Sequence, residues 1–209
     1  MSGFCYTDLM QTPPLRFSHL APDTWSALEQ IPRTGWILWN IPNPETIADH
    51  TLDLRKLACS LHPDLGLNEV EFDKLLDMLE IHDWAESIVG DIAVDALPLN
   101  EQKHVASDKR YQERQAMQKI CNEISQYGTY IFDLFDEHEN RTTKISNIAF
   151  HIDKIHADIK AVEYEVLHKV PGMAWEFLNC DKKRFTLPLF KKMWQEFYDN
   201  PDIFRDYTR

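Results

Sequence analysis

A chain of 209 residues with 44% hydrophobic and 27% charged residues has the length and balance of one globular domain with a substantial core. Its formal net charge of −12 repels phosphate backbones and anionic lipids, which argues against a nucleic-acid polymer or a membrane surface as its partner. The four cysteines lack metal-finger or CxxC spacing, and the sequence shows neither a signal-peptide pattern nor an apolar run of about 20 residues, so we expect a cytoplasmic protein.

Helical patterns begin after a polar N-terminal lead-in, which we assign to residues 1–21. A short helix is expected over 22–30, and the segment 32–44, bounded by prolines, is predicted to be an ordered loop. That loop contains Arg33 and Trp36. Loops that carry an arginine and aromatic residues are more often functional than purely polar ones, so both residues are candidates for binding.

Two helices follow the loop. Apolar residues recur on one face over about 46–63, and His50 borders that face, where a lone histidine is more often packed in a core than bound to a metal. Asn68 with Glu71 resembles a capping box, which predicts the start of the next helix. The apolar stripe of that helix extends to His82.

The end of this second helix carries the most informative residues. Asp83 follows His82 directly, and a neutral imidazole beside a carboxylate offers mixed nitrogen and oxygen ligation for a divalent metal. Glu86 and Asp91 come within the next residues and could handle protons on a metal-bound water. A His-Asp pair is common by chance, so its context must decide what it does.

The rest of the chain also has helical periodicity. We expect a charged helix over about 101–126, a short amphipathic helix over 129–138, a long helix over 143–169 and a final helix over 187–199. Asp153 borders the apolar stripe of the long helix, where a carboxylate is costly unless a cation or hydrogen-bond donors meet it. No stretch alternates as a strand does, so the predicted fold class is all-α.

Four of these residues stand in the order H…HD…D, namely His50, His82, Asp83 and Asp153. In that order the chain resembles HD-domain phosphohydrolases, in the branch of the bacterial 5′-deoxynucleotidases and their eukaryotic relatives. The resemblance extends beyond the four residues and covers well over half of the chain. The matching stretches are PRTGW (32–36), ETIADH (45–50), IHDWAESIVGDI (81–92), EQKH (101–104) with Glu113, and FHIDKIHADIKAVEYE (150–165).

The resemblance implies an HD-domain helical bundle of about six or more helices. We place this domain at residues 22–170 and treat residues 171–209 as a C-terminal helical extension packed on it. It also implies a homodimer, whose interface cannot be read from the periodicity.

The implied activity is removal of the 5′-phosphate from nucleoside monophosphates by a metal-bound water. One divalent ion (Mn, Co, Fe, Ni or Zn) would be held by the four residues of the H…HD…D set. A set of two histidines and two aspartates suits each of these ions, so the metal itself is not determined.

Further residues receive roles from the same resemblance. Glu86 would orient or deprotonate the water, and Asp91 would protonate the leaving alkoxide or position it. Arg33 would grip the phosphate with its planar guanidinium, Trp36 would lie against the sugar or base, and Lys103 would contribute to substrate binding.

Some residues depart from the family pattern. Thr46 stands where we expect serine, and Trp84 replaces a smaller apolar residue after the His-Asp pair. In the bacterial enzymes the arginine directly precedes the tryptophan, whereas Thr34 and Gly35 separate Arg33 from Trp36 here. Sugar selection by that tryptophan is therefore in doubt for this chain.

Alternative interpretations stay open. Glu86 could be a solvent residue at a helix end, Asp91 a turn residue, and Arg33 a loop cap. The protein could be an HD-domain binding protein without turnover. It could also be a dinuclear oxygenase or phosphodiesterase, for which additional histidines such as His104 and His138 would have to reach the metal.

Overall fold

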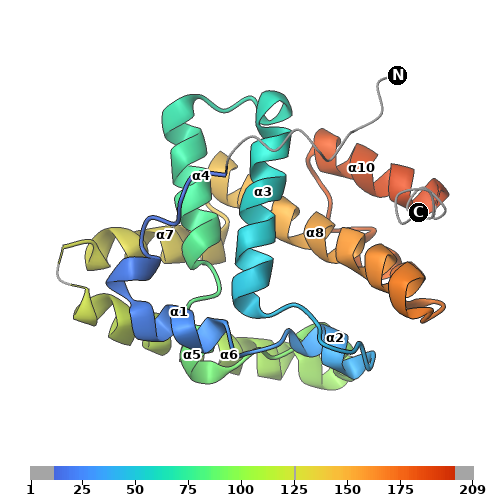
Figure 1. The fold of residues 1–209 in the computed structure, drawn as a ribbon, viewed down its shortest axis with the longest axis horizontal. Helices are drawn as coiled ribbons and strands as arrows, with labels where there is room; N and C mark the ends of the chain where they lie inside the picture. Colours follow the sequence, from blue (N-terminus) through green and yellow to red (C-terminus); the bar gives the residue numbers. More distant parts are fainter. Residues whose placement is uncertain (1–11, 125, 201–209) are drawn as a thin grey trace.

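The computed structural model describes residues 12–124 and 126–200, and the all-α prediction is confirmed there (Figure 1). The one departure from helix and loop in these residues is an isolated antiparallel bridge between Pro32 and Thr46. The elements, in chain order, are η1 (Ser18–Leu20), α1 (Pro22–Leu28), α2 (Thr34–Leu38), α3 (Ile47–Leu65), α4 (Glu69–Ile81), α5 (Glu86–Val89), η2 (Val94–Ala96), α6 (Leu99–Glu123), α7 (Gly128–Asn140), α8 (Lys144–His168), α9 (Met173–Asp181) and α10 (Pro188–Asp199).

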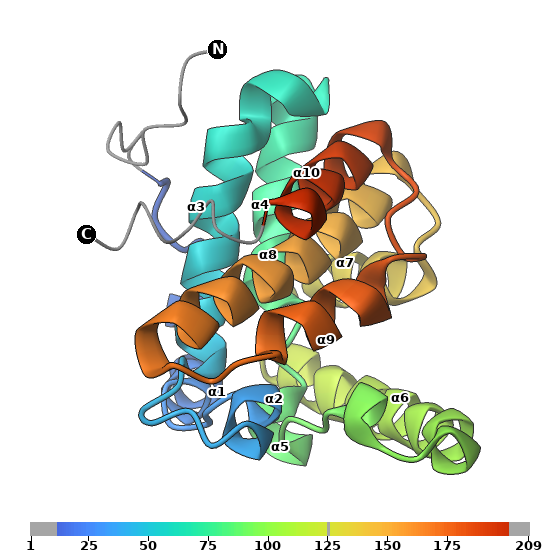
Figure 2. The same ribbon diagram turned by 90° about the vertical axis from the view of Figure 1, so that its right-hand side faces the viewer.

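The core lies where α3, α4 and α8 meet. Figure 1 shows α3 and α4 side by side with α8 crossing behind them, and all three pairs are in contact. Figure 2 shows α9 and α10 lying along the other side of α8. The apolar stripes predicted from the periodicity face this core, where the following side chains have no exposed surface: Ile47, Leu54, Leu75, Met78, Leu79, Ile152 and Ile155.

Local sequence signals fix where these three helices begin. Thr46, Asn68 and Thr143 each cap a helix as part of a capping box, so the predicted Asn68 cap is confirmed. The hydroxyl of Thr46 accepts the backbone N–H of Asp49, which is the task that a serine would perform. The substitution of threonine for serine therefore leaves the start of α3 intact.

Two segments differ from the sequence prediction. The predicted loop 32–44 contains the helix α2, and α9 was not predicted as a separate helix. Both are short, so neither spans enough turns for a period of 3.6 residues to stand out. The helix α3 also passes Pro63, near its predicted end, and stops at Gly66, whose φ of 59° is favourable for glycine.

Residues 12–21, the described part of the predicted lead-in, pack firmly against the bundle. Phe17 is completely buried, and the backbone N–H groups of Arg16, Phe17 and Ser18 all donate to the carboxylate of Glu80 on α4. Residues 1–11 of the predicted lead-in and residues 201–209 of the predicted C-terminal extension lie outside the described residues. Among the described helices, none has the length and apolar character needed to cross a membrane.

Candidate metal centre

The four residues of the H…HD…D set converge at the crossing of α3, α4 and α8. Nε2 of His50 lies 3.2 Å from Oδ1 of Asp153 and 4.0 Å from Oδ2 of Asp83. Nε2 of His82 lies 3.1 Å from the same oxygen of Asp83. Residues up to 103 positions apart in the sequence thus direct their ligand atoms to one point.

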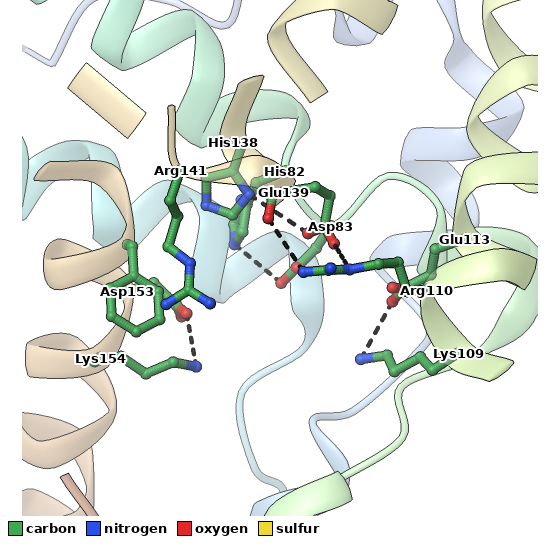
Figure 3. Close-up of a pocket in the computed structure, with 11 residues that line it drawn as sticks. His82, Asp83, Lys109, Arg110, Glu113, His138, Glu139, Arg141, Asp153 and Lys154 are labelled. Carbon is green, nitrogen blue, oxygen red and sulfur yellow. Dashed lines mark hydrogen bonds and ion pairs between the residues drawn. The ribbon is translucent and has the colours of Figure 1, made fainter. Parts of the chain in front are cut away.

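The helices explain this convergence. His50 lies in the first turn of α3, where its N–H donates to the carbonyl of the capping Thr46. His82 is the C-cap of α4, so the chain leaves the helix there and Asp83 turns toward the same space. Asp153 reaches that space from the middle of α8 (Figure 3).

The donor atoms fit a divalent cation. Both Nε2 atoms are buried, and neither has a hydrogen bond among the described residues, although carboxylate oxygens lie about 3 Å away. Two ligands bound at about 2.1 Å and at right angles are themselves roughly 3 Å apart. Such near contacts without hydrogen bonds have the spacing that ligand atoms adopt around a divalent ion.

Charge in the site is strongly coupled. Burial alone would raise the pKa of Asp83, but the neighbouring His82 and Arg33 outweigh it and hold that pKa well below its usual range. Burial opposes the charged form of His82, yet the Asp83 carboxylate outweighs it and raises the pKa of His82 to about 9. A metal ion would therefore have to displace a proton from His82 on binding.

Arg33 reaches the same carboxylate. Its Nη1 lies 3.3 Å from Oδ2 of Asp83, and both side chains are largely but not fully buried. The planar guanidinium has further N–H groups beyond the one used here. The predicted phosphate-binding residue therefore lies beside the metal ligands.

Glu86 is buried rather than exposed at a helix end. Its Oε1 accepts a hydrogen bond of 2.9 Å from Nζ of Lys109, while its Oε2 has no partner among the described residues. Burial and the charge of Asp83 raise the pKa of Glu86 to about 8. A carboxyl group with a pKa in this range can exchange protons near neutral pH.

Asp91 has a structural task in the described structure. Its side chain accepts the backbone N–H of Thr34 at 2.6 Å, and its carbonyl accepts the Thr34 hydroxyl at 2.8 Å. These bonds hold the first residue of α2 directly after Arg33. The geometry supports Asp91 as the residue that positions Arg33, and it resembles the turn-residue alternative more than an acid facing a leaving group.

Trp36 does not face the metal ligands. Only 2% of its surface is exposed, and its ring stacks on Phe177 of α9 at a centroid distance of 4.9 Å. Its Nε1 donates to Glu45. The expectation that Trp36 lies against the sugar or base conflicts with this burial. Trp84, which replaces a smaller apolar residue of the family pattern, is likewise fully buried in the core.

A cavity of about 210 Å³ opens on three of the four candidate ligands, His82, Asp83 and Asp153 (Figure 3). It is lined by His82, Asp83, Lys109, Arg110, Glu113, His138, Glu139, Arg141, Phe150, Asp153 and Lys154. Lys103, predicted to bind substrate, is exposed on α6 and is not among these residues. The lysine of α6 that does line the cavity is Lys109, which forms ion pairs with both Glu86 and Glu113.

The sequence contained a signal for Lys109. Glu113 was part of the matched set, and a lysine four residues before it lies on the same face of a helix. The cationic lining from Arg110, Arg141 and Lys154 had no such signal. Lys154 directly follows Asp153 on α8, and its long side chain turns back to within 2.9 Å of the Asp153 carboxylate.

The remaining histidines divide between the site and the surface. The ring of His138 lies 5.5 Å from that of His82, and neither of its nitrogens has a hydrogen bond among the described residues. His104 is exposed and pairs with Asp108. One of the two histidines named for a dinuclear centre therefore lies beside the ligands and the other does not.

Comparison with known proteins gives consistent relatives. A family model described as HD domain matches residues 25–194. The chain is 31% identical to 5′-deoxynucleotidase HDDC2 of Xenopus laevis over 173 residues, which is 82% of this chain and 81% of that protein. It is 33% identical over 150 residues to 5′-deoxynucleotidase hdd1 of Schizosaccharomyces pombe, 68% of this chain and 70% of that one.

A solved structure has the same fold. A conserved hypothetical protein from Pyrococcus furiosus superposes with a TM-score of 0.65 at 27% identity, covering 84% of this chain and 96% of that chain. PH0347 protein from Pyrococcus horikoshii gives a TM-score of 0.60 at 25% identity, covering 82% and 93%. The helical fold is thus shared along nearly the whole length of the two Pyrococcus proteins.

Proposed function

The chain belongs to the HD-domain family, and from that premise we propose that it is a metal-dependent phosphohydrolase that removes the 5′-phosphate from nucleoside monophosphates. The observation that carries the proposal is the convergence of His50, His82, Asp83 and Asp153, with two buried imidazole nitrogens that lack hydrogen bonds. Relatives named 5′-deoxynucleotidase, at about 30% identity over most of the chain, support the substrate class.

The four ligands would hold one divalent ion, whose identity and number remain part of the proposal. When bound, such an ion supplies Lewis-acid polarisation of the phosphoryl group and lowers the pKa of a coordinated water. Phosphoryl transfer needs little covalent help from protein, so the remaining residues act by placement and charge.

Glu86 is the proposed proton acceptor. Its free Oε2 and its pKa of about 8 suit a group that takes a proton from water, and Lys109 fixes its other oxygen. Arg33 would bind the phosphate through the N–H groups that Asp83 leaves free, while Asp91 holds the backbone beside it.

The cations of the cavity address a problem set by the net charge. A chain of charge −12 repels a phosphate dianion, but Arg110, Arg141 and Lys154 line the cavity beside the ligands. Together with a bound divalent ion they would outweigh the carboxylates that also line the cavity and let the anion approach. We further propose a cytoplasmic homodimer that takes no nucleic-acid polymer.

The test is phosphate release by the purified protein from a panel of deoxyribonucleoside and ribonucleoside monophosphates, with Mn²⁺, Co²⁺ and other divalent ions in turn. We expect metal-dependent release that His82→Ala abolishes. A ligand-dependent rise in melting temperature without phosphate release would instead identify a nucleotide-binding protein without turnover.

A further inference from the structure

The second nitrogen of His50 makes a contact that the metal centre does not explain. Nδ1 of His50 lies 3.1 Å from Nδ1 of His156 on α8, with the two rings inclined at 60°. His50 is completely buried and His156 is 5% exposed. Two imidazole nitrogens can approach this closely only if one carries a hydrogen and the other offers a lone pair.

The direction of this hydrogen bond follows from the other side of the His50 ring. Nε2 of His50 faces Asp153 and Asp83, and it needs a free lone pair to bind a cation. With an ion bound to Nε2, the single proton of the neutral ring sits on Nδ1, which donates to Nδ1 of His156. His156 in turn has to be the tautomer with its own proton on Nε2.

No other described group can perform this task. The nearest carboxylate oxygen, Oε1 of Glu45, is 3.8 Å from Nδ1 of His50, which is too long for a hydrogen bond. That oxygen already accepts the indole N–H of Trp36 at 2.9 Å. His156 is therefore the acceptor that the position of His50 requires.

The other histidine ligand is held in the same way by a different kind of atom. Nδ1 of His82 lies 2.9 Å from the carbonyl of Leu79, which can only accept. The backbone carbonyl thus keeps a proton on Nδ1 of His82, so the proton that an ion displaces is the one on Nε2. For His50 the enforcing group is a side chain, which a substitution can remove.

We propose that His156 is a positioning residue that selects the tautomer of His50 and so presents the Nε2 lone pair to the divalent ion. The inference rests on the proposed metal centre and adds a residue that acts through one of its ligands. Partners of metal-binding histidines typically change metal affinity by about 10- to 100-fold when they are removed.

The first test uses the unaltered, full-length protein loaded with Zn²⁺, a diamagnetic divalent ion. Nitrogen-15 NMR of the imidazole groups, with the His50 signals assigned by their loss in His50→Gln, should show His50 protonated at Nδ1 with Nε2 bound to the ion. An unprotonated Nδ1 of His50, or an ion bound through Nδ1, would overturn the proposal. This measurement requires no variant of His156 and no activity.

The second test compares His156→Asn with His156→Leu, because the two side chains have nearly the same size and shape but only asparagine offers an acceptor. We expect Mn²⁺ binding to weaken by about 10- to 100-fold in His156→Leu, with mixed His50 tautomers, and to be largely kept in His156→Asn. Equal Mn²⁺ affinities in folded Leu and Asn variants would contradict the role of His156. Failure of the unaltered protein to bind any divalent ion would instead remove the metal centre on which the proposed function depends.

Discussion

Two carboxyl groups five residues apart on α8, those of Asp153 and Asp158, have pKa values shifted in opposite directions. At Asp153, burial alone would raise the pKa, but Lys154, His50 and Arg33 outweigh it and hold it well below 3.8. At Asp158, burial and the nearby Asp181 raise the pKa to about 8. Both oxygens of Asp158 are buried without a hydrogen bond among the described residues. The neighbours, and not the residue type or the helix, decide which carboxylate is ionised and ready to bind a cation.

The largest effect at the ionised carboxylate, Asp153, is expected from removing its charge, since it is a proposed metal ligand. Asp153→Asn keeps the shape of the side chain but removes its charge, so Mn²⁺ binding and metal-dependent phosphate release should both fall by more than about 100-fold, beyond the loss typical of residues that only support a ligand. Calorimetric titration with Mn²⁺ and a phosphate-release assay measure the two effects. Undiminished Mn²⁺ affinity would place the ion elsewhere.

Glu86→Gln should separate metal binding from catalysis at the same candidate metal centre. The variant keeps an oxygen for Lys109 but cannot take up a proton, so we expect turnover to fall by about 10²- to 10⁴-fold with Mn²⁺ affinity nearly unchanged. Steady-state kinetics beside the same titration give both values. Retained turnover would remove Glu86 from the reaction.

The protonation state of Asp158, the neutral carboxyl group of the pair, can be tested through the free energy of unfolding. The unfolded chain ionises Asp158 near 3.8 and the folded chain near 8, so between these pH values only the unfolded state loses the proton. Stability should therefore decrease as pH rises from about 4 to about 8. Asp158→Asn, which carries no charge, should be more stable than the unaltered protein by about 2 to 4 kcal/mol at pH 8 and about equally stable below pH 4.

Denaturant unfolding at both pH values measures this difference. Asp23→Asn is the matched control, since Asp23 is an exposed acidic residue in the first turn of α1. It should not reproduce the pH-dependent gain. The same pH slope in the unaltered protein and in Asp158→Asn would mean that Asp158 is ionised in the folded state.

Lys103→Ala should have the smallest effect on catalysis and serves as the reference for substitutions in the cavity. The residue is exposed and does not line the cavity, so we expect catalytic efficiency to change by less than about twofold. Lys109→Ala is the comparison, because it frees the buried Glu86 and Glu113. Comparable losses in the two variants would restore Lys103 to the substrate site.

The sequence was sufficient for the parts that local patterns and the family order determine. The all-α fold, the Asn68 cap and the place of His82 at the end of a helix follow from periodicity and capping, and the structure confirms them. The convergence of His50 and Asp153 on the His82-Asp83 pair was inferred from their order along the chain. Ligand atoms of His50, His82 and Asp83 lie within 4.8 Å of one another, and Asp153 lies 3.2 Å from His50, while their role as metal ligands stays a prediction.

The parts in which the structure differs from the sequence prediction, or adds to it, depend on how helices pack. Trp36 is buried because Phe177 of α9 covers it, and α9 was not predicted. Lys109 and Lys103 lie on one long solvated helix, where composition does not determine which lysine faces the cavity. The contact of His156 with His50 exists only because α8 crosses α3, a geometry that periodicity does not encode.

Glu80 makes the start of the chain part of the support for the metal ligands. Its fully buried carboxylate lies two residues before His82 and accepts the backbone N–H groups of residues 16–18 in addition to Arg55. A shortened protein cut at residue 25, where the family match begins, would lose those three donors and strand part of a buried negative charge at the base of the His82 turn. A domain boundary drawn from family similarity alone would therefore remove residues that stabilise the C-terminal end of α4, next to His82.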